Sequence, residues 1–221
     1  MTTVIWDEGR LHIPCWVVDL ASFRRWVESD EFPEEGRICF INGDVWADLS
    51  RQQIFSHLRV KATLTTVISR LVQGMGEGMY LTDGLRWFNN QARISAVPDG
   101  TYLSYDALRQ GRVRLVEGKE GGYAAVEGSP DFVIEVVSDN SEDKDTEWQV
   151  RAYWDAGIRE YWLIDAREDP PRFDICKYGL KGFTAARKSA GWVKSAVLGK
   201  SFCLEATRNA LGHPDYLLQV R

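Results

Sequence analysis

The chain has 221 residues, of which 44% are hydrophobic and 27% are charged. This composition is typical of a soluble globular protein, with enough chain for one domain and its core. The formal net charge of −5 argues against a surface built entirely for nucleic acid, although a local basic groove stays compatible with it. The four cysteines form no CxxC pair, so a zinc site is not expected. No apolar run is long enough to span a membrane, and no secretion signal begins the chain, so we expect a cytoplasmic protein.

The first third of the chain predicts a short helix, a hairpin and a longer helix. Asp19 can cap a helix over 19–29, whose apolar residues fall on one face. Asn42-Gly43 lies between two strand-like runs and is a strong hairpin signal. Apolar residues recur at three- and four-residue intervals over 52–72, which predicts the longer helix.

The middle of the chain predicts two strands and an insertion. The segment MYLTDGLRWF is expected to be a strand with a turn at Asp83-Gly84. The segment ISAVPDGTYLSY is expected to form another single strand. Residues 106–128 are rich in glycine and charge, which predicts a loop or a poorly ordered insertion.

The C-terminal part predicts a strand, a helix and a second strand. PDFVIEVVS is a near-continuous apolar run that indicates a buried central strand. A helix is expected over 145–156, stopped by Gly157, and EYWLID follows as another buried strand. This order is a βαβ crossover between parallel strands. Shorter antiparallel strands follow, and the whole chain, 1–221, is expected to be one α/β domain.

Glu135 lies in the middle of the apolar strand. Alternation along that strand places two sets of side chains on opposite faces, Asp131, Val133, Glu135 and Val137 against Phe132, Ile134 and Val136. A lone carboxylate among valines has a large desolvation cost unless it is paired or binds a metal. Both interpretations stay open, the pairing partner being an arginine such as Arg151 or Arg159.

Asp99 is a second carboxylate in a similar setting. It follows Pro98 at the start of an apolar run, where a proline without an N–H is well placed. Alone, this aspartate is typical of a turn. Together with Glu135, it suggests a site for a hard cation, because Mg²⁺ usually takes one or two carboxylates plus waters and phosphate oxygens.

Three strings in order, VPDG, PDFVIEVVS and DAGIREYWLID, resemble the Uma-two-type family of restriction endonucleases in the PD-(D/E)xK nuclease superfamily. INGDVW followed by a helix that contains His57 also matches the family's order, and the similarity covers about residues 18–165. The resemblance implies a restriction-endonuclease-like central mixed sheet flanked by helices, with extra antiparallel strands. It also implies that Asp99 and Glu135 hold the metal, Mg²⁺ or Mn²⁺.

The resemblance further implies a catalytic lysine, and here the chain departs from the pattern. The superfamily places the lysine two residues after the glutamate, where this chain has Val137. The related family places it in the following helix, four residues before a tyrosine like Tyr153, where this chain has Gln149. Lys144, near the start of the same helix, is the candidate replacement. The alternative is that Lys144 is a solvated lysine in the acidic run SEDKDTE.

Other residues are accessory candidates. His57 could bind phosphate or shuttle protons, or it could be a structural histidine. Gln149 could orient a water without adding charge, and Asp48 and Glu127 are further acidic candidates for the metal. Two basic groups could follow a phosphate backbone or lie on a solvated surface: Arg109, Arg112, Arg114 and Lys119, and Arg187, Lys188, Lys194 and Lys200.

Two functions follow from these observations. The first is a Mg²⁺-dependent endonuclease that hydrolyses phosphodiester bonds in DNA, with Asp99 and Glu135 on the metal and Lys144 stabilising negative charge. By family analogy we expect a homodimer, since two strands are to be cut. The second is a catalytically weak or inactive nuclease-fold binding or regulatory module, favoured by Val137, Gln149 and the acidic net charge.

Overall fold

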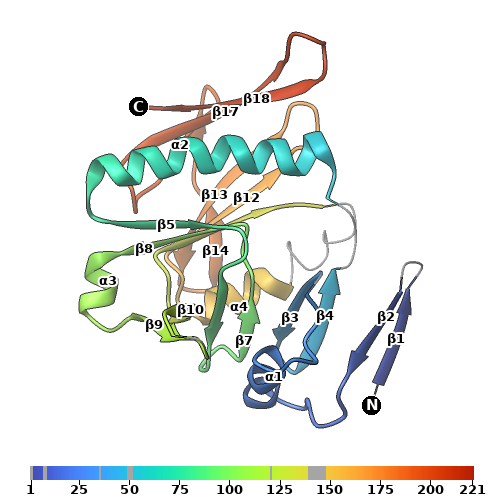
Figure 1. Cartoon of the computed structure of the whole chain (residues 1–221). Coiled ribbons are helices and arrows are strands. Elements are labelled where there is room, and N and C mark those ends of the chain that lie inside the picture. The colour runs from blue at the N-terminus through green and yellow to red at the C-terminus, as the bar shows by residue number, and fades with distance from the viewer. Residues whose placement is uncertain (1, 7–8, 35, 49–51, 120, 139–147) are drawn as a thin grey trace.

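A six-stranded mixed sheet lies at the centre of the molecule, in the order β14-β13-β12-β11-β8-β5 (Figure 1). Its strands are β5 (Gly78–Thr82), β8 (Gly100–Ser104), β11 (Phe132–Val136), β12 (Glu160–Asp165), β13 (Arg172–Gly179) and β14 (Gly182–Ala185). Strands β11 and β12 are parallel, and the other neighbours are antiparallel. The structure, a computed structural model, describes residues 2–6, 9–34, 36–48, 52–119, 121–138 and 148–221.

One face of the central sheet is covered by the long helix and by the C-terminal strands. A π-helical turn, η1 (Ile54–Arg59), leads into helix α2 (Val60–Met75), which crosses the sheet beneath the β17–β18 hairpin (Figure 1). The C-terminal sheet contains β15 (Lys188–Ser189), β16 (Trp192–Lys194), β17 (Ser201–Arg208) and β18 (Pro214–Val220). Apolar side chains of α2, β11, β12, β16, β17 and β18 belong to one core cluster.

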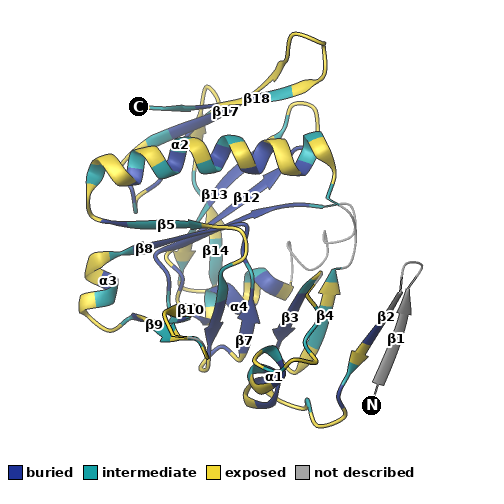
Figure 2. Cartoon of the chain, viewed as in Figure 1, coloured by how far each residue is buried: buried dark blue, intermediate teal, exposed yellow. Residues whose placement is uncertain are grey.

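The opposite face packs against helix α4 (Gln149–Asp155) and a second six-stranded sheet, in the order β4-β3-β7-β6-β10-β9. The strands of this sheet are β3 (Arg37–Ile41), β4 (Asp44–Asp48), β6 (Arg86–Asn89), β7 (Ile94–Ala96), β9 (Val113–Glu117) and β10 (Tyr123–Gly128). Figure 2 shows that β8, β11 and β12 are buried between the two layers. A charged group on these strands is therefore far from bulk water.

The N-terminal segment adds a hairpin and a helix beside β3. The hairpin pairs β1 (Thr2–Trp6) with β2 (Gly9–Ile13), and helix α1 spans Leu20–Val27. Asp19 caps α1 as predicted, because its side chain accepts a hydrogen bond from the Ser22 amide at 2.7 Å. Helix α1 buries Phe23 and Trp26 in a third apolar cluster.

Several sequence predictions are confirmed. Asn42 and Gly43 have positive φ values of 53° and 108° in the turn between β3 and β4, as a tight hairpin requires. The β11 alternation holds, because Phe132, Ile134 and Val136 lie in the α2-side core, and Val133 and Val137 lie in the other. The predicted helix over 145–156 is described from residue 148 onward, since 145–147 lie outside the described residues.

Two segments expected to be single strands are each divided between the two sheets. In MYLTDGLRWF, β5 joins the central sheet and β6 the second sheet, on either side of the Asp83-Gly84 turn. In ISAVPDGTYLSY, β7 joins the second sheet and β8 the central sheet. Pro98 has no N–H for a strand ladder, so the chain can leave one sheet there and enter the other.

The prediction of a loop over 106–128 is wrong. This stretch contains the end of helix α3 (Tyr105–Arg109) and strands β9 and β10. Ser104 caps α3 by accepting a hydrogen bond from the Ala107 amide at 3.0 Å. Strand β9 is an edge strand and most of its residues are partly exposed, so the stretch is polar and has no long apolar run. No described helix is long and apolar enough to cross a membrane.

Candidate active site

Asp99 lies directly before β8, and Glu135 lies in β11, the neighbouring strand of the central sheet. The β8–β11 ladder pairs Gly100 with Ile134. Asp99 precedes Gly100 and Glu135 follows Ile134, so both acids lie next to this pair at the same end of the antiparallel ladder. The backbone amide of Val136 donates a hydrogen bond to Oδ2 of Asp99 at 2.7 Å. Asp99 is 3% exposed and Glu135 is 2% exposed, so both carboxylates are buried.

Asp99 is surrounded by basic side chains from three different elements. Arg37 of β3 donates to Oδ1 of Asp99. The Nζ atom of Lys61, on α2, lies 3.1 Å from the same oxygen, and Nε2 of His57 lies 3.8 Å from Oδ2. Burial alone would raise the pKa of Asp99, but Arg37, Lys61 and His57 outweigh it and lower that pKa to about 2. Asp99 is therefore ionised at neutral pH.

Glu135 is held by two side chains of helix α4. The Tyr153 hydroxyl donates to Oε1 of Glu135 at 2.5 Å, and Nε2 of Gln149 donates to the same oxygen. Burial and the charge of Glu135 raise the pKa of Tyr153 well above its usual value, so the phenol keeps the proton that it donates. Gln149 and Tyr153 are one helical turn apart and reach Glu135 from the same face of α4.

His57 lies against the same two strands. Its Nε2 is 2.9 Å from the carbonyl oxygen of Val136, and its Nδ1 is 3.1 Å from Oε1 of Gln52. Burial lowers the pKa of His57 more than the charge of Asp99 raises it, so a neutral ring is favoured. A neutral His57 can donate from one ring nitrogen only, and Val136 is its buried acceptor.

A cleft of about 380 Å³ opens beside this cluster. It is lined by residues of several elements: Gly36, Arg37, Asp48, Gln52, His57, Asp83, Gly84, Val97 and Ser138. Asp48, the accessory acidic candidate, accepts a hydrogen bond from the Ser138 hydroxyl at 3.3 Å. The cleft therefore connects the surroundings of Asp99 to solvent and carries charges of both signs.

The donor set fits a hard divalent ion. Asp99 and Glu135 offer carboxylate oxygens, and Oε1 of Gln149 is a buried amide oxygen that accepts from no donor within the described residues. Such an oxygen is free to accept from a metal-bound water. The described part of the chain contains no group of three or more His, Cys, Asp or Glu residues placed to hold a metal. Two carboxylates are a donor set that Mg²⁺ or Mn²⁺ can accept when waters complete the coordination.

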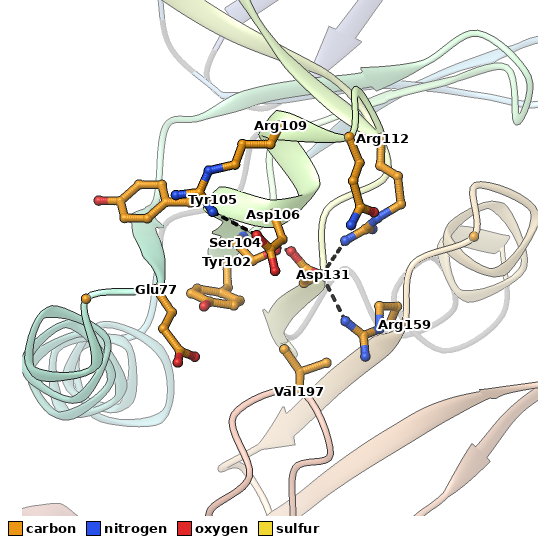
Figure 3. Close-up of a pocket in the computed structure, with 13 residues that line it drawn as sticks. Glu77, Tyr102, Ser104, Tyr105, Asp106, Arg109, Arg112, Asp131, Arg159 and Val197 are labelled. Atoms are coloured by element: carbon orange, nitrogen blue, oxygen red, sulfur yellow. Dashed lines mark hydrogen bonds and ion pairs between the residues drawn. The ribbon is translucent and has the colours of Figure 1, made fainter.

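Asp131, the other Pro-Asp aspartate, has a structural role at the opposite end of β11. Arg112 donates to Oδ1 of Asp131 at 2.7 Å and Arg159 at 3.2 Å, and the Ser104 amide donates to Oδ2 at 2.8 Å (Figure 3). A cavity of about 730 Å³ lies beside them, but its arginines and carboxylates balance: Arg109, Arg112 and Arg159 against Glu77, Asp106 and Asp131. This balance does not favour a phosphate.

The arginines named as alternative partners for Glu135 bind elsewhere. Arg159 pairs with Asp131, and Arg151 pairs with Asp155 one turn along α4, at 3.2 Å. The salt-bridge interpretation is therefore wrong for both, because these arginines pair with Asp131 and Asp155 instead. Glu127, the other accessory acid, accepts from Arg114 and from Asn90.

Most of the first basic group is already paired. Arg109 pairs with Asp106, Arg112 with Asp131, and Arg114 with Glu127. In the second group Lys188 pairs with Asp174 at 2.8 Å. These arginines and this lysine neutralise local carboxylates, which weakens the idea of a free basic track. Lys144 lies outside the described residues, so its assignment stays a prediction.

Sequence reasoning missed Arg37 and Lys61. Both reach Asp99 from segments distant in the chain, one from the strand before the Asn42-Gly43 hairpin and one from the long helix. One signal was available for Lys61: it follows His57 by four residues, which places both side chains on one helical face. For Arg37 no sequence signal existed, since its position depends on how the two sheets pack.

The mixed central sheet and its carboxylate pair define a nuclease-like α/β protein. The chain belongs to the Uma2 family, described as "Putative restriction endonuclease", whose model matches residues 14–172. A solved structure, a putative nuclease belonging to DUF820 from Anabaena variabilis ATCC 29413, is similar to this chain with a TM-score of 0.60 and 19% identity. The match covers 82% of this chain and 91% of that one, and it shows a shared fold. No curated protein matches the chain.

Proposed function

We propose that this protein hydrolyses phosphodiester bonds in DNA with the help of Mg²⁺ or Mn²⁺ held by Asp99 and Glu135. The observation that carries the proposal is the buried carboxylate pair on neighbouring strands, joined by the hydrogen bond from the Val136 amide to Asp99. Burying two such acids is costly for the fold unless a ligand or other partners compensate. The family adds support, because its description is that of a restriction endonuclease.

The reaction would be an ordinary hydrolysis. The oxygen of a water forms a bond to phosphorus, the bond from phosphorus to one sugar oxygen breaks, and that oxygen keeps the electron pair and takes a proton. The bound divalent ion would supply Lewis-acid chemistry, by polarising a phosphate oxygen and lowering the pKa of a water. Asp99 stays ionised to hold it. Tyr153 and Gln149 fix the orientation of Glu135 by donating to its Oε1.

Contact with DNA would be limited to the cleft beside Asp99. The net charge of −5 does not support a wide basic surface, and Arg37 lines the cleft beside the site, where a phosphate could approach it. A homodimer remains the expected assembly, because cutting both strands of a duplex is simplest with two sites.

A second candidate function is a nuclease-fold module that binds without cutting. One specific observation favours it: Gln149 occupies the position where the family resemblance implies a lysine, and it binds Glu135 from there. Val137, the other lysine position, is 2% exposed and lies in the apolar core. Neither side chain can supply a positive charge.

A cleavage assay distinguishes the two functions. Supercoiled, linear duplex and single-stranded DNA would each be incubated with the protein in Mg²⁺, in Mn²⁺ and in EDTA. The proposal predicts metal-dependent cutting that is lost in Asp99→Asn and in Glu135→Gln. Asp131→Asn is the matched control, because it changes a buried aspartate next to the same strand without touching the pair. Failure of the wild type to cut any DNA in either metal would contradict the proposal and support the second candidate.

A further inference from the structure

Lys61 is a buried lysine that contacts Asp99. It stands at neither of the two positions, 137 and 149, where the family resemblance implies a lysine. The residue is 8% exposed and belongs to the first turn of α2. A lysine is rarely this buried unless it is paired. Its Nζ atom lies 3.1 Å from Oδ1 of Asp99 and 3.2 Å from Oε1 of Gln52, and it also donates to Asp83.

Arg37 and Lys61 share two carboxylates, Asp83 and Asp99. Arg37 is ion-paired with Asp99, and its guanidinium also donates to Asp83 at 2.7 Å. Lys61 forms ion pairs with the same two carboxylates. Asp99 is therefore in contact with two cations. Glu135 directly precedes Val136, the residue whose amide donates to Asp99. The positive charges of Arg37 and Lys61 offset the negative charges of Asp83 and Asp99.

We propose that Lys61 supplies the positive charge that the family's lysine provides elsewhere and that Gln149 cannot provide here. This inference rests on the proposed function. The ammonium has three N–H donors on a flexible stem. A phosphate oxygen next to Asp99 would lie within reach of an ammonium 3.1 Å from that carboxylate. Donation to that oxygen stabilises the negative charge that develops as water attacks phosphorus, and it needs no further reactant.

Lys61 and Lys144 compete for this assignment. Lys144 was inferred from its place in the chain between Glu135 and α4, whereas Lys61 is assigned by contact with Asp99. The two assignments predict opposite results for single substitutions. Lys61→Met should lower the cleavage rate about 10²-fold, on the order of losing one transition-state donor. If Lys144 supplies the charge instead, Lys144→Ala should be the slow variant. Lys181→Met, in an exposed turn, is the matched control that should keep the rate.

Rescue tests whether the lost feature is the charge. Adding Gln149→Lys to Lys61→Met places an ammonium beside Glu135, because Gln149 already contacts that carboxylate. The double variant should recover most of the lost rate. Lys61→Arg should keep part of it, which covers the case in which Lys61→Met folds poorly. A lysine that only supports the fold would not be rescued from a different helix.

Mn²⁺ binding gives a readout that does not depend on cleavage. The Lys61 ammonium neutralises Asp99 and repels a cation, so Lys61→Met should bind Mn²⁺ at least as tightly as the wild type in calorimetry. Asp99→Asn should lose Mn²⁺ binding. A Lys61→Met protein that cuts slowly but binds Mn²⁺ well would identify a charge that acts on the phosphate.

The inference would be overturned by wild-type cleavage in Lys61→Met, by weakened Mn²⁺ binding in that variant, or by loss of cleavage in Lys144→Ala alone. If the wild type does not cut DNA but Gln149→Lys does, Lys61 does not supply the charge. If neither protein cuts DNA, the proposed function fails and this inference fails with it. Cutting by the wild type with full activity in Lys61→Met is the distinct result in which only the Lys61 assignment is wrong.

Discussion

The backbone amide of Val136 donates a hydrogen bond to Oδ2 of Asp99 at 2.7 Å. Because Val136 directly follows Glu135, this bond holds Asp99 close to the part of β11 that carries Glu135. The carbonyl of the same residue accepts from His57 at 2.9 Å. Val136 thus uses both of its backbone groups to join the end of β11 to Asp99 and to η1. Asp99 is therefore held by a backbone donor, whereas Glu135 is held by the α4 side chains Gln149 and Tyr153.

Tyr153→Phe tests whether the α4 side chains position Glu135. The substitution removes a hydroxyl that donates to a buried carboxylate at 2.5 Å, and the ring itself stays in the core. We expect the free energy of unfolding in urea to fall by about 1–3 kcal/mol, because Glu135 keeps its desolvation cost and loses a donor. Tyr178→Phe is the matched control, since Tyr178 is 49% exposed. An unchanged unfolding midpoint for Tyr153→Phe would show that the hydroxyl does not hold Glu135.

Asp131→Asn tests the assignment of Asp131 as a structural carboxylate. Burial raises the pKa of Asp131, but the Ser104 hydrogen bonds and Arg112 outweigh it, so the folded pKa is lowered from 3.8. The stability gained from this group is therefore present above pH 3.8 and is lost as the pH falls through the lower folded pKa. The wild type should exceed Asp131→Asn in free energy of unfolding by about 1–3 kcal/mol at neutral pH.

That difference should shrink as the pH is lowered below 3.8, because the wild-type carboxylate is then progressively protonated. The measurement is urea unfolding of both proteins at several pH values. A difference that does not change with pH would mean that the charge of Asp131 contributes nothing to the Arg112 and Arg159 contacts.

Short sequence patterns correctly predicted a helix cap, a hairpin turn and the alternation along one strand. Asp19 caps α1, Asn42-Gly43 turns the β3–β4 hairpin, and the alternation along β11 places Glu135 as expected. Each depends on residues within one element. The division of ISAVPDGTYLSY between two sheets could not be predicted in this way, because β7 and β8 look alike as strands and differ only in their partners.

The cations of the site show the same limit of local reasoning. Lys144 was selected as the only lysine between Glu135 and Lys177 in the chain. Lys61 precedes Glu135 by more than seventy residues in sequence, yet its Nζ contacts Asp99, because η1 and α2 pack across the end of β11. Candidates for a shared site have to be sought by packing, and packing is decided by the tertiary fold.

The measurement that tests the Asp99–Glu135 site most directly is a calorimetric Mn²⁺ titration of the wild type, Asp99→Asn, Glu135→Gln and Asp131→Asn, with melting curves recorded in parallel. Mn²⁺ should bind the wild type and raise its melting temperature, because a ligand at 100 times its Kd stabilises the native state by about 2.7 kcal/mol. Asp131→Asn should bind Mn²⁺ like the wild type, and both site variants should lose binding and the thermal shift. Absence of Mn²⁺ binding by the wild type at millimolar concentration, or equal binding by Asp99→Asn, would contradict the assignment of these two carboxylates as the metal site.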